Sequence, residues 1–287
     1  MATVGSGDYK FEIVPSWPKV PKYWDLGIAS DGAVNSAGEV YVFGRGDHPI
    51  TIWNADGSFI SAWGEGAFKM AHGIHIGPDD DVWLVDTLEH VVTRHAPGGE
   101  VLRTMGNRGI PRASYHGGPF NMPSGAAVAP NGDLFVSDGY GGHRVHRFDA
   151  DGELMLSWGK EGDGPGEFVN LHNIGVDKRN RVFICDRENN RIQIFDANGE
   201  VLEIWTELTA PNDLWIDGDV ISVTDVAVPA FPVGRVSVWT LDGDLITRWR
   251  GREGALAGIE IGGHGIWLDG EGSLYLGGPH VTKFQRQ

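Results

Sequence analysis

The amino-acid sequence predicts an all-β fold, a six-bladed β-propeller that forms a single domain over residues 1–287. A pair of apolar strands recurs along the chain, with roughly forty to fifty residues from one repeat to the next. A hairpin dipeptide follows the next strand in most repeats: Asp56-Gly57, Gly98-Gly99, Asp151-Gly152, Asn198-Gly199 and Asp242-Gly243. Such dipeptides supply the positive φ angles of tight hairpins. Four antiparallel strands per repeat at this spacing are typical of propeller blades.

The repeat is clearest between residues 168 and 195. Alternation of apolar and polar residues, together with β-branched content, predicts strands at residues 173–176, 182–185 and 191–195. A polar turn separates the first two strands, and a charged loop separates the second from the third. A fourth strand, usually ending in tryptophan, follows the hairpin, so each repeat predicts one four-stranded blade.

The second strands of the six repeats lie at residues 38–43, 80–86, 132–138, 180–186, 218–225 and 272–278. The sixth repeat is incomplete, because the chain ends soon after its third strand at residues 281–284. Residues 10–15 have strand character and no partner nearby in sequence, so we expect them to complete the last blade and to cover its edge. Two longer loops, residues 107–122 and 226–234, are candidates to cover one mouth of the ring. The alternative architecture is a β-sandwich with coincidental spacing.

Composition limits the possible partners. The chain carries 39 Asp and Glu against 23 Lys and Arg, for a net charge of −16, which repels phosphate backbones and anionic membrane surfaces. We therefore expect neither a nucleic-acid nor a membrane partner. The candidate site described below leads us to expect a small-molecule substrate, and oligomeric state is not predicted. The single cysteine, Cys185, lies in an apolar strand and indicates a reducing compartment. Residues 1–14 lack the pattern of a signal peptide, so a cytoplasmic protein is expected.

Three histidines occupy matching positions in alternate repeats. His72, His172 and His264 each stand ten residues before an aligned position in the second strand. In alternate blades they would lie about 120° apart around the central channel and point at a common axis. Three such imidazoles, with a position left open, suit zinc or a similar divalent metal. The alternative is that each histidine only forms a hydrogen bond to a neighbouring loop. The equivalent residues of the other repeats are Ser30, Ser124 and Asn212.

The loops that leave the second strands lie on the same face as these histidines, because antiparallel strands reverse direction at each turn. They carry Arg45, Tyr140 and Arg187 as candidate catalytic residues. Arginine binds carboxylates through paired N–H groups, and a tyrosine close to a metal and to arginines can have a lowered pKa and act as a base. Aspartates recur at one blade position and are expected to structure the loops: Asp86, Asp138, Asp186 and Asp225.

Five segments around these residues are more specific than generic propeller repeats: YVFGRGDH around Arg45, AHGIHIGPDDDVWLVD around His72, MPSGAAVAPNGDLFVSDGYGGHRV around Tyr140, NLHNIGV with CDRENNRIQIF around His172, and GHGIWLDGEGSLYLG around His264. Through them the chain resembles the peptidyl-α-hydroxyglycine α-amidating lyase family, six-bladed propellers of NHL-type repeats. The resemblance implies three zinc ligands, a catalytic tyrosine and two catalytic arginines: His72, His172, His264, Tyr140, Arg45 and Arg187.

The chain departs from that family in identifiable places. The family has an aspartate after the third zinc histidine, where it holds a structural calcium, and this chain has Gly265 instead. Calcium is therefore not expected. Leu171 and Gly263 replace prolines that precede two of the family's histidines, and one cysteine cannot form the disulfides of the animal enzymes.

The resemblance implies a zinc-dependent lyase that breaks the carbon–nitrogen bond of an N-(α-hydroxyalkyl) amide, or carbinolamide. The products would be an amide and a carbonyl compound such as glyoxylate. Tyr140 would take the hydroxyl proton, while Arg45 and Arg187 would hold charge on the tyrosine or the substrate. Two alternatives stay open: a metal-dependent hydrolase acting on a lactone or ester, and a propeller that serves as a protein-binding platform without catalysis.

Overall fold

The structure is a computed structural model that describes residues 3–113, 120–229, 233–250 and 263–287. Among these residues the one helical segment is the 3-10 turn η1 (Arg187–Asn189), and none of them forms a helix long and apolar enough to cross a membrane. All other regular structure is antiparallel β-sheet, in six sheets that correspond to the six predicted blades. The predicted fold class is confirmed. Parts of the two longer loops, residues 114–119 and 230–232, lie outside the described residues.

The chain divides into two compact units. Unit 1 contains residues 1–66 and 212–287, and unit 2 contains residues 67–211. The sheets of unit 2 are formed by β7 (Ala71–Ile76), β8 (Val82–Asp86), β9 (Val91–His95) and β10 (Val101–Gly106); by β11 (Gly125–Val128), β12 (Leu134–Asp138), β13 (Arg144–Phe148) and β14 (Leu154–Trp158); and by β15 (Leu171–Val176), β16 (Val182–Asp186), β17 (Arg191–Phe195) and β18 (Val201–Trp205).

Unit 1 contains two further four-stranded sheets and one five-stranded sheet. The four-stranded sheets are formed by β3 (Ala29–Val34), β4 (Val40–Gly44), β5 (Ile50–Trp53) and β6 (Phe59–Trp63), and by β19 (Pro211–Asp217), β20 (Val220–Asp225), β21 (Arg235–Thr240) and β22 (Leu245–Arg250). The five-stranded sheet has the order β1 (Thr3–Ser6), β2 (Tyr9–Val14), β25 (Thr282–Arg286), β24 (Leu274–Leu276) and β23 (Ile266–Leu268).

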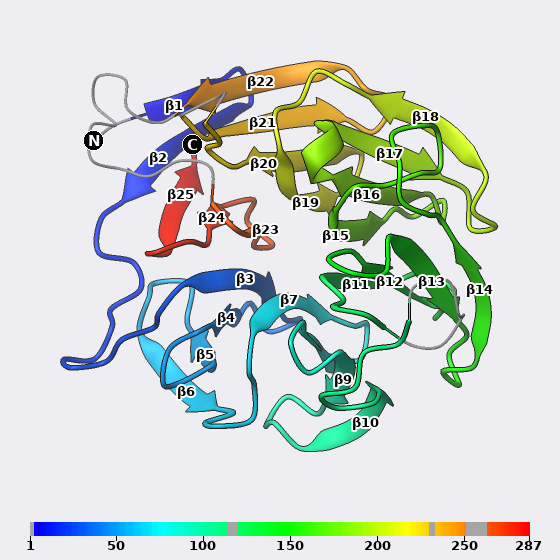
Figure 1. Cartoon of the computed structure of the whole chain (residues 1–287). Helices are drawn as coiled ribbons and strands as arrows, with labels where there is room; N and C mark the ends of the chain where they lie inside the picture. The colour runs from blue at the N-terminus through cyan, green and yellow to red at the C-terminus, as the bar shows by residue number, and fades with distance from the viewer. Residues whose placement is uncertain (1–2, 114–119, 230–232, 251–262) are drawn as a thin grey trace. The chain divides into compact units, whose positions relative to one another are not determined.

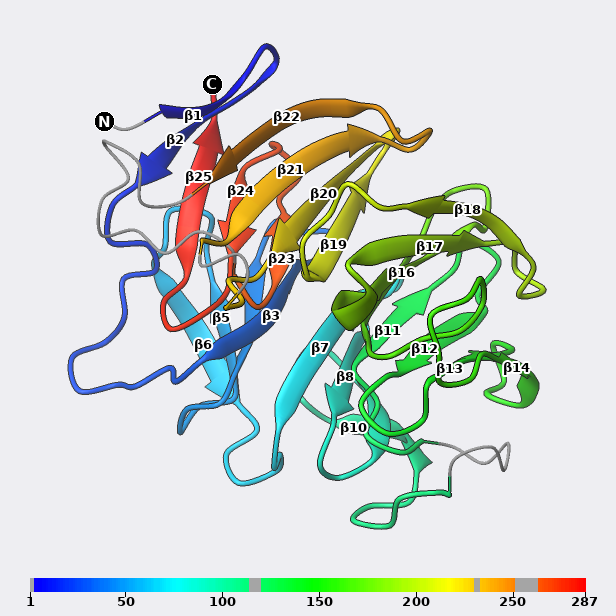
Figure 2. The same ribbon diagram turned by 45° about the horizontal axis from the view of Figure 1, so that its top comes forward.

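An N-terminal strand completes the last blade, as the sequence predicts. β2 pairs with β25 in antiparallel register, with Phe11 opposite Arg286 and Val14 opposite Lys283, and the two strands run side by side in Figures 1 and 2. The sequence did not predict β1, which pairs with β2 and makes this sheet five-stranded. Because β1 continues directly from β2 through a tight turn, its pairing needs no distant partner.

The second strand of each blade is buried except for half-buried Val220 at the start of β20, whereas the fourth strands contain mostly exposed and half-buried residues. β8, β12 and β16 contain only buried residues, while β10 begins with exposed Val101 and Leu102. A strand covered on both faces needs a continuous apolar run, which explains motifs such as VWLVD and VFICD. The Cys185 thiol is fully buried in β16, as predicted for a core cysteine.

The predicted hairpin dipeptides adopt the backbone conformation they were expected to supply. The second residue of each has a positive φ, for example 83° at Gly57 and 82° at Gly199. Each of these hairpins is followed by a register shift between the third and fourth strands, as between Ile194 and Phe195. The local dipeptides therefore determine how the strands of each blade pair.

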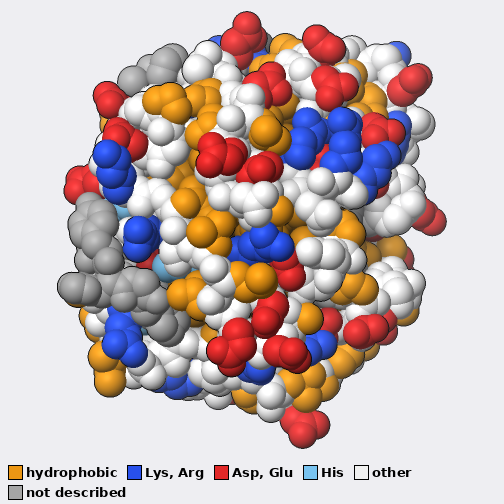
Figure 3. All heavy atoms as spheres, turned by 90° about the vertical axis from the view of Figure 1, so that its right-hand side faces the viewer, with side chains coloured by type: hydrophobic (Ala, Val, Ile, Leu, Met, Phe, Trp, Pro, Cys, Tyr) orange, Lys and Arg blue, Asp and Glu red, His pale blue; other side chains and the backbone are white. Residues whose placement is uncertain are grey.

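Acidic side chains are spread over the face of the molecule seen in Figure 3, and Lys and Arg occur between them in smaller groups. This distribution agrees with the net charge of −16.

Candidate metal and catalytic site

The first strands of two blades in unit 2 carry a β-bulge at the candidate histidines. In β7, Ala71 pairs with Asp86 and Ile74 with Leu84, so His72 and Gly73 together face a single residue of β8. In β15, Leu171 pairs with Asp186 and Ile174 with Ile184, so His172 and Asn173 do the same. A bulge redirects a side chain that would otherwise follow the regular alternation of the strand. Both histidines are buried, with 2% and 1% exposure.

Hydrogen bonding determines the tautomer of His72. Its Nδ1 lies 2.6 Å from the carbonyl oxygen of Ser124. A carbonyl only accepts hydrogen bonds, so Nδ1 carries the proton and Nε2 keeps a lone pair. The Tyr140 hydroxyl lies 2.9 Å from Nε2 and donates to it.

The same unit gathers three of the other predicted residues around His72. The rings of His72 and His172 have centroids 4.7 Å apart, and the Tyr140 ring stands edge-on to His172 at 5.7 Å. The guanidinium of Arg187 lies 5.9 Å from the centre of the Tyr140 ring and also pairs with Glu188 at 2.7 Å. Unit 2 therefore brings together His72, His172, Tyr140 and Arg187, which come from three different blades.

Unit 1 repeats this arrangement around the third histidine. Nδ1 of His264 lies 2.7 Å from the carbonyl oxygen of Ser30 and must donate to it, so Nε2 again keeps the lone pair. Arg45 donates to that lone pair from Nη2 at 3.4 Å. The side-chain amide of Asn212 donates to the backbone carbonyl of His264 at 2.6 Å. Unit 1 therefore brings Arg45 and His264 together.

Sequence reasoning missed the role of the residues that replace histidine in the other blades. Ser30 and Ser124 offer backbone carbonyls to the histidine of the preceding blade, and Asn212 contacts the backbone of His264. Their matched position in the repeat was visible in the sequence. Their role was not, because a backbone carbonyl carries no residue-specific signal.

The aspartates that end the second strands organise loops, as predicted. Asp86 accepts hydrogen bonds from the backbone N–H groups of Lys69 and Met70 at 2.8 and 3.0 Å. Asp138 accepts from Asn121 N–H at 2.8 Å. The others form buried ion pairs: Asp186 with Arg191 and Asp225 with Arg235. Asp86 and Asp138 thus hold the loops that lead into β7 and β11, whereas Asp186 and Asp225 hold the first residue of the third strand.

Gly265 follows His264 at the place where the resembling family has an aspartate. A Cβ atom there would lie 2.7 Å from Cα of Asp31 and 2.7 Å from the carbonyl oxygen of Ser30. Both are backbone atoms, so a larger residue would require β3 to move. The same carbonyl accepts the His264 hydrogen bond, so glycine at this position permits the close approach that fixes the histidine.

Comparison with known proteins identifies the chain's relatives. A family model described as a 6-bladed beta-propeller matches residues 128–214. Human NHL repeat-containing protein 3 is 31% identical over 210 residues, which cover 69% of this chain and 59% of that protein. A Caenorhabditis elegans protein named "Probable peptidyl-alpha-hydroxyglycine alpha-amidating lyase" is 32% identical over 200 residues, which cover 60% of this chain and 57% of that protein. The chain is a propeller homologous to both.

The resemblance to the amidating lyases is thus confirmed at the level of homology. The chain spans only 57% to 59% of the length of these two relatives. Among solved structures, a streptogramin B lyase superposes with a TM-score of 0.66 at 16% identity, covering 98% of this chain and 100% of that one. At that identity the match supports the propeller fold alone.

The donor atoms of the three candidate histidines could hold a metal ion. Each of the three histidines offers one ring nitrogen as a possible ligand. In His72 and His264, Nδ1 carries the proton and donates it in a hydrogen bond to a backbone carbonyl. This bond orients the ring and leaves Nε2 without a proton, as a metal ligand must be. Tyr140 and Arg45 donate to these Nε2 atoms, and because one lone pair cannot serve two partners, a metal ion would compete with both donors.

Gly139→Ala is expected to disturb the candidate site while leaving its candidate residues unchanged. A Cβ at Gly139 would lie 1.7 Å from the carbonyl oxygen of Leu171, so the loop before Tyr140 must move away from the strand that carries His172. We expect a loss of about 1 to 3 kcal/mol in the free energy of unfolding, measured by chemical denaturation. The control is Gly98→Ala, where an added Cβ meets nothing within 4 Å. Equal stability of the two variants would show that the loop adapts without cost.

Proposed function

We propose that the protein is a metal-dependent carbon–nitrogen lyase. It would cleave a carbinolamide, such as a peptidyl-α-hydroxyglycine-like compound, into an amide and a carbonyl compound such as glyoxylate. The observation that carries the proposal is the 2.9 Å hydrogen bond from the Tyr140 hydroxyl to Nε2 of His72. It joins a candidate proton carrier to a candidate metal ligand. The lyase name of a relative supports the same chemistry.

We further propose that His72, His172 and His264 bind one divalent ion, zinc or a similar metal. Their matched position in alternate repeats supports this proposal, as does the short distance between the His72 and His172 rings. In addition, Nδ1 of both His72 and His264 donates a hydrogen bond to a backbone carbonyl, which leaves Nε2 available as a ligand. When bound, such an ion supplies Lewis acidity that lowers the pKa of the substrate hydroxyl.

The residues of the chain would then move protons and hold charge. Tyr140 acts as a phenolate, after it has lost its own proton. The phenolate oxygen accepts the proton of the substrate hydroxyl, the O–H electron pair forms the carbonyl, and the C–N bond breaks with its electron pair going to nitrogen, which gains a proton. No water is consumed. Arg187, beside the Tyr140 ring, favours negative charge on the phenol oxygen. Arg45, beside His264, is suited to bind a substrate carboxylate through its N–H groups.

Product analysis with α-hydroxyhippurate tests the reaction class. We expect the metal-loaded protein to release benzamide and glyoxylate in equal amounts, faster than the spontaneous reaction in buffer. Separation of products by liquid chromatography distinguishes this from hydrolysis of the amide bond, which would release benzoate. Benzoate as the main product would favour a metal-dependent hydrolase, and no product above the buffer rate would count against an enzyme acting on this substrate.

A further inference from the structure

Tyr140 lies in a loop that has little to hold it from within. The loop has the sequence GYGG over residues 139–142, and glycines bring no side-chain contacts and allow a wide range of backbone conformations. The Tyr140 hydroxyl bonds to Nε2 of His72, but a metal ion on that nitrogen would displace the bond. The position of the phenol in a metal-loaded site therefore depends on contacts from outside the loop.

Asn121 contacts this loop on both sides of the tyrosine. Its backbone N–H donates to the two carboxylate oxygens of Asp138 at 2.8 and 2.9 Å, and its side-chain amide donates to the carbonyl oxygen of Gly141 at 3.1 Å. The backbone N–H of Tyr140 donates to the carbonyl oxygen of the next residue, Met122, at 3.2 Å. Two consecutive residues thus hold the chain before, at and after Tyr140.

The segment that carries Asn121 is itself fixed in place. Its neighbours Phe120 and Met122 have φ angles of 57° and 62°, a left-handed conformation that residues other than glycine adopt only where their surroundings enforce it. Phe120 is fully buried. The preceding blade holds Met122, whose backbone N–H donates to Nδ1 of His90 at 3.0 Å. A segment anchored in this way can position the loop beside it.

We infer that Asn121 is a positioning residue for Tyr140. Its side-chain amide, bound to the Gly141 carbonyl, holds the phenol oxygen beside Nε2 of His72. The inference rests on the proposed function, because Asn121 contributes to the rate only if Tyr140 takes part in proton transfer. The amide acts on the loop and not on the substrate, so its removal should lower kcat and leave KM nearly unchanged.

Asn121→Ala removes this amide and keeps the backbone hydrogen bond to Asp138. We expect kcat for α-hydroxyhippurate to fall by about 10- to 100-fold, because a displacement of about 1 Å can cost as much as 100-fold in rate. In a Tyr140→Phe background the substitution should have little further effect, since no phenol oxygen is left to position. The control is Asn131→Ala, which removes an amide bonded to Asp133 at 3.0 Å in the turn between β11 and β12. It should retain the wild-type kcat.

Gly141→Ala displaces the same amide without changing Asn121. A Cβ at Gly141 would lie 2.7 to 2.8 Å from three atoms of the Asn121 side chain. The φ of Gly141 lies outside the left-handed region, so the backbone itself accepts alanine. We expect kcat to fall as it does in Asn121→Ala. In the double variant the added methyl group meets no amide, so the two losses should be less than additive. The control is Gly98→Ala, where an added Cβ meets nothing within 4 Å.

NMR of protein labelled with carbon-13 at the hydroxyl-bearing ring carbon of tyrosine tests the inference without turnover. The chain has six tyrosines, and Tyr140→Phe identifies the Tyr140 signal by its loss. With zinc added, Asn121→Ala and Gly141→Ala should shift or broaden this signal and leave the signals of the other tyrosines in place. Asn131→Ala should leave every signal unchanged.

These measurements separate failure of the positioning role from failure of the reaction. An unchanged Tyr140 signal in Asn121→Ala would overturn the inference. A change spread over all tyrosines would overturn it too, because Asn121 would then support the blade in general. Wild-type turnover of α-hydroxyhippurate by Asn121→Ala would leave the lyase proposal standing and remove the positioning role. A selective change of the Tyr140 signal, in a protein that cleaves no carbinolamide, would support the positioning of Tyr140 by Asn121 and contradict the lyase.

Discussion

Tyr140→Phe is expected to lower kcat for carbinolamide cleavage by about two to four orders of magnitude, the usual contribution of a general acid or base. The substitution removes one hydroxyl, which donates to Nε2 of His72 across 2.9 Å. The ring should remain in place, because its contacts with His72 and His172 involve ring faces and edges. Metal binding should persist or strengthen, since the competing hydrogen bond to His72 disappears.

Steady-state kinetics of glyoxylate release would measure this effect on protein of known metal content. Tyr23→Phe is the matched control, because Tyr23 is 90% exposed and lies outside the site. It should retain wild-type kinetics. A Tyr140→Phe enzyme with wild-type kcat would exclude the phenol from proton transfer, even if the reaction itself is confirmed.

A double-mutant cycle would connect Arg187 to the same step. The guanidinium lies 5.9 Å from the Tyr140 ring centre, so Arg187→Ala should reduce the rate partly by raising the pKa of the phenol. In Tyr140→Phe the hydroxyl is absent, so Arg187 can no longer affect the rate through the pKa of the phenol. The double variant should therefore lose less activity than the two single losses combined. If the two losses are fully additive, Arg187 acts directly on the substrate and not through the pKa of Tyr140.

The blades could be predicted from sequence because their signals are local. The Asp-Gly and Asn-Gly turns, the buried second strands and the spacing of the repeats each involve residues close together in the chain. The pairing of β2 with β25 joins the two ends of the chain, yet it was predictable because the last repeat lacked a strand and residues 10–15 lacked a partner. β1 escaped prediction, since Thr3–Ser6 is short and only one of its residues is buried.

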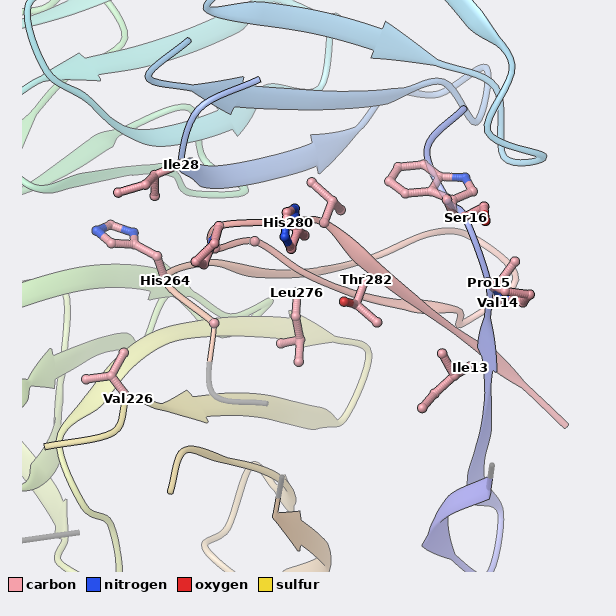
Figure 4. A pocket seen from close by; sticks show the side chains of 16 residues that line it. Ile13, Val14, Pro15, Ser16, Ile28, Val226, His264, Leu276, His280 and Thr282 are labelled. Atoms are coloured by element: carbon pink, nitrogen blue, oxygen red, sulfur yellow. The ribbon is translucent and has the colours of Figure 1, made fainter. Parts of the chain in front are cut away.

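The site could be predicted only as far as repetition marked its residues. His72, His172 and His264 were visible because they break the repeat in alternate blades. The β-bulges at His72 and His172 were not, because a bulge depends on the register between two strands. Nor was the apolar pocket beside His264 (Figure 4), whose walls combine residues 13–17 with residues 276–282. Those segments meet only after the last blade is complete.

His172→Ala is expected to remove most of the bound metal from the protein while leaving the fold intact. A three-histidine site that loses one ligand retains two, and we expect its metal affinity to fall on the order of 100-fold or more. This loss should exceed the one caused by removing a residue that only supports a ligand through a hydrogen bond. The strand should survive, because β15 pairs with β16 on both sides of the bulge through Leu171 and Ile174.

The control for this variant is His95→Ala, which also removes a buried histidine from unit 2. His95 is 4% exposed and bonds to Gly99 and Thr93, away from the candidate site. Both substitutions leave a cavity and should reduce stability, but only His172→Ala should lose metal in elemental analysis.

Thermal melts provide a second measurement of the same site. A metal that binds only the folded state stabilises it by about 2.7 kcal/mol at a free concentration of 100 times its Kd, so zinc should raise the Tm of the wild type and of His95→Ala. The same concentration should have little effect on His172→Ala, whose site would be far from saturation. If zinc stabilises all three proteins equally, the metal binds elsewhere. His72 and His264 would then be residues that hold neighbouring blades through their hydrogen bonds to the Ser124 and Ser30 carbonyls.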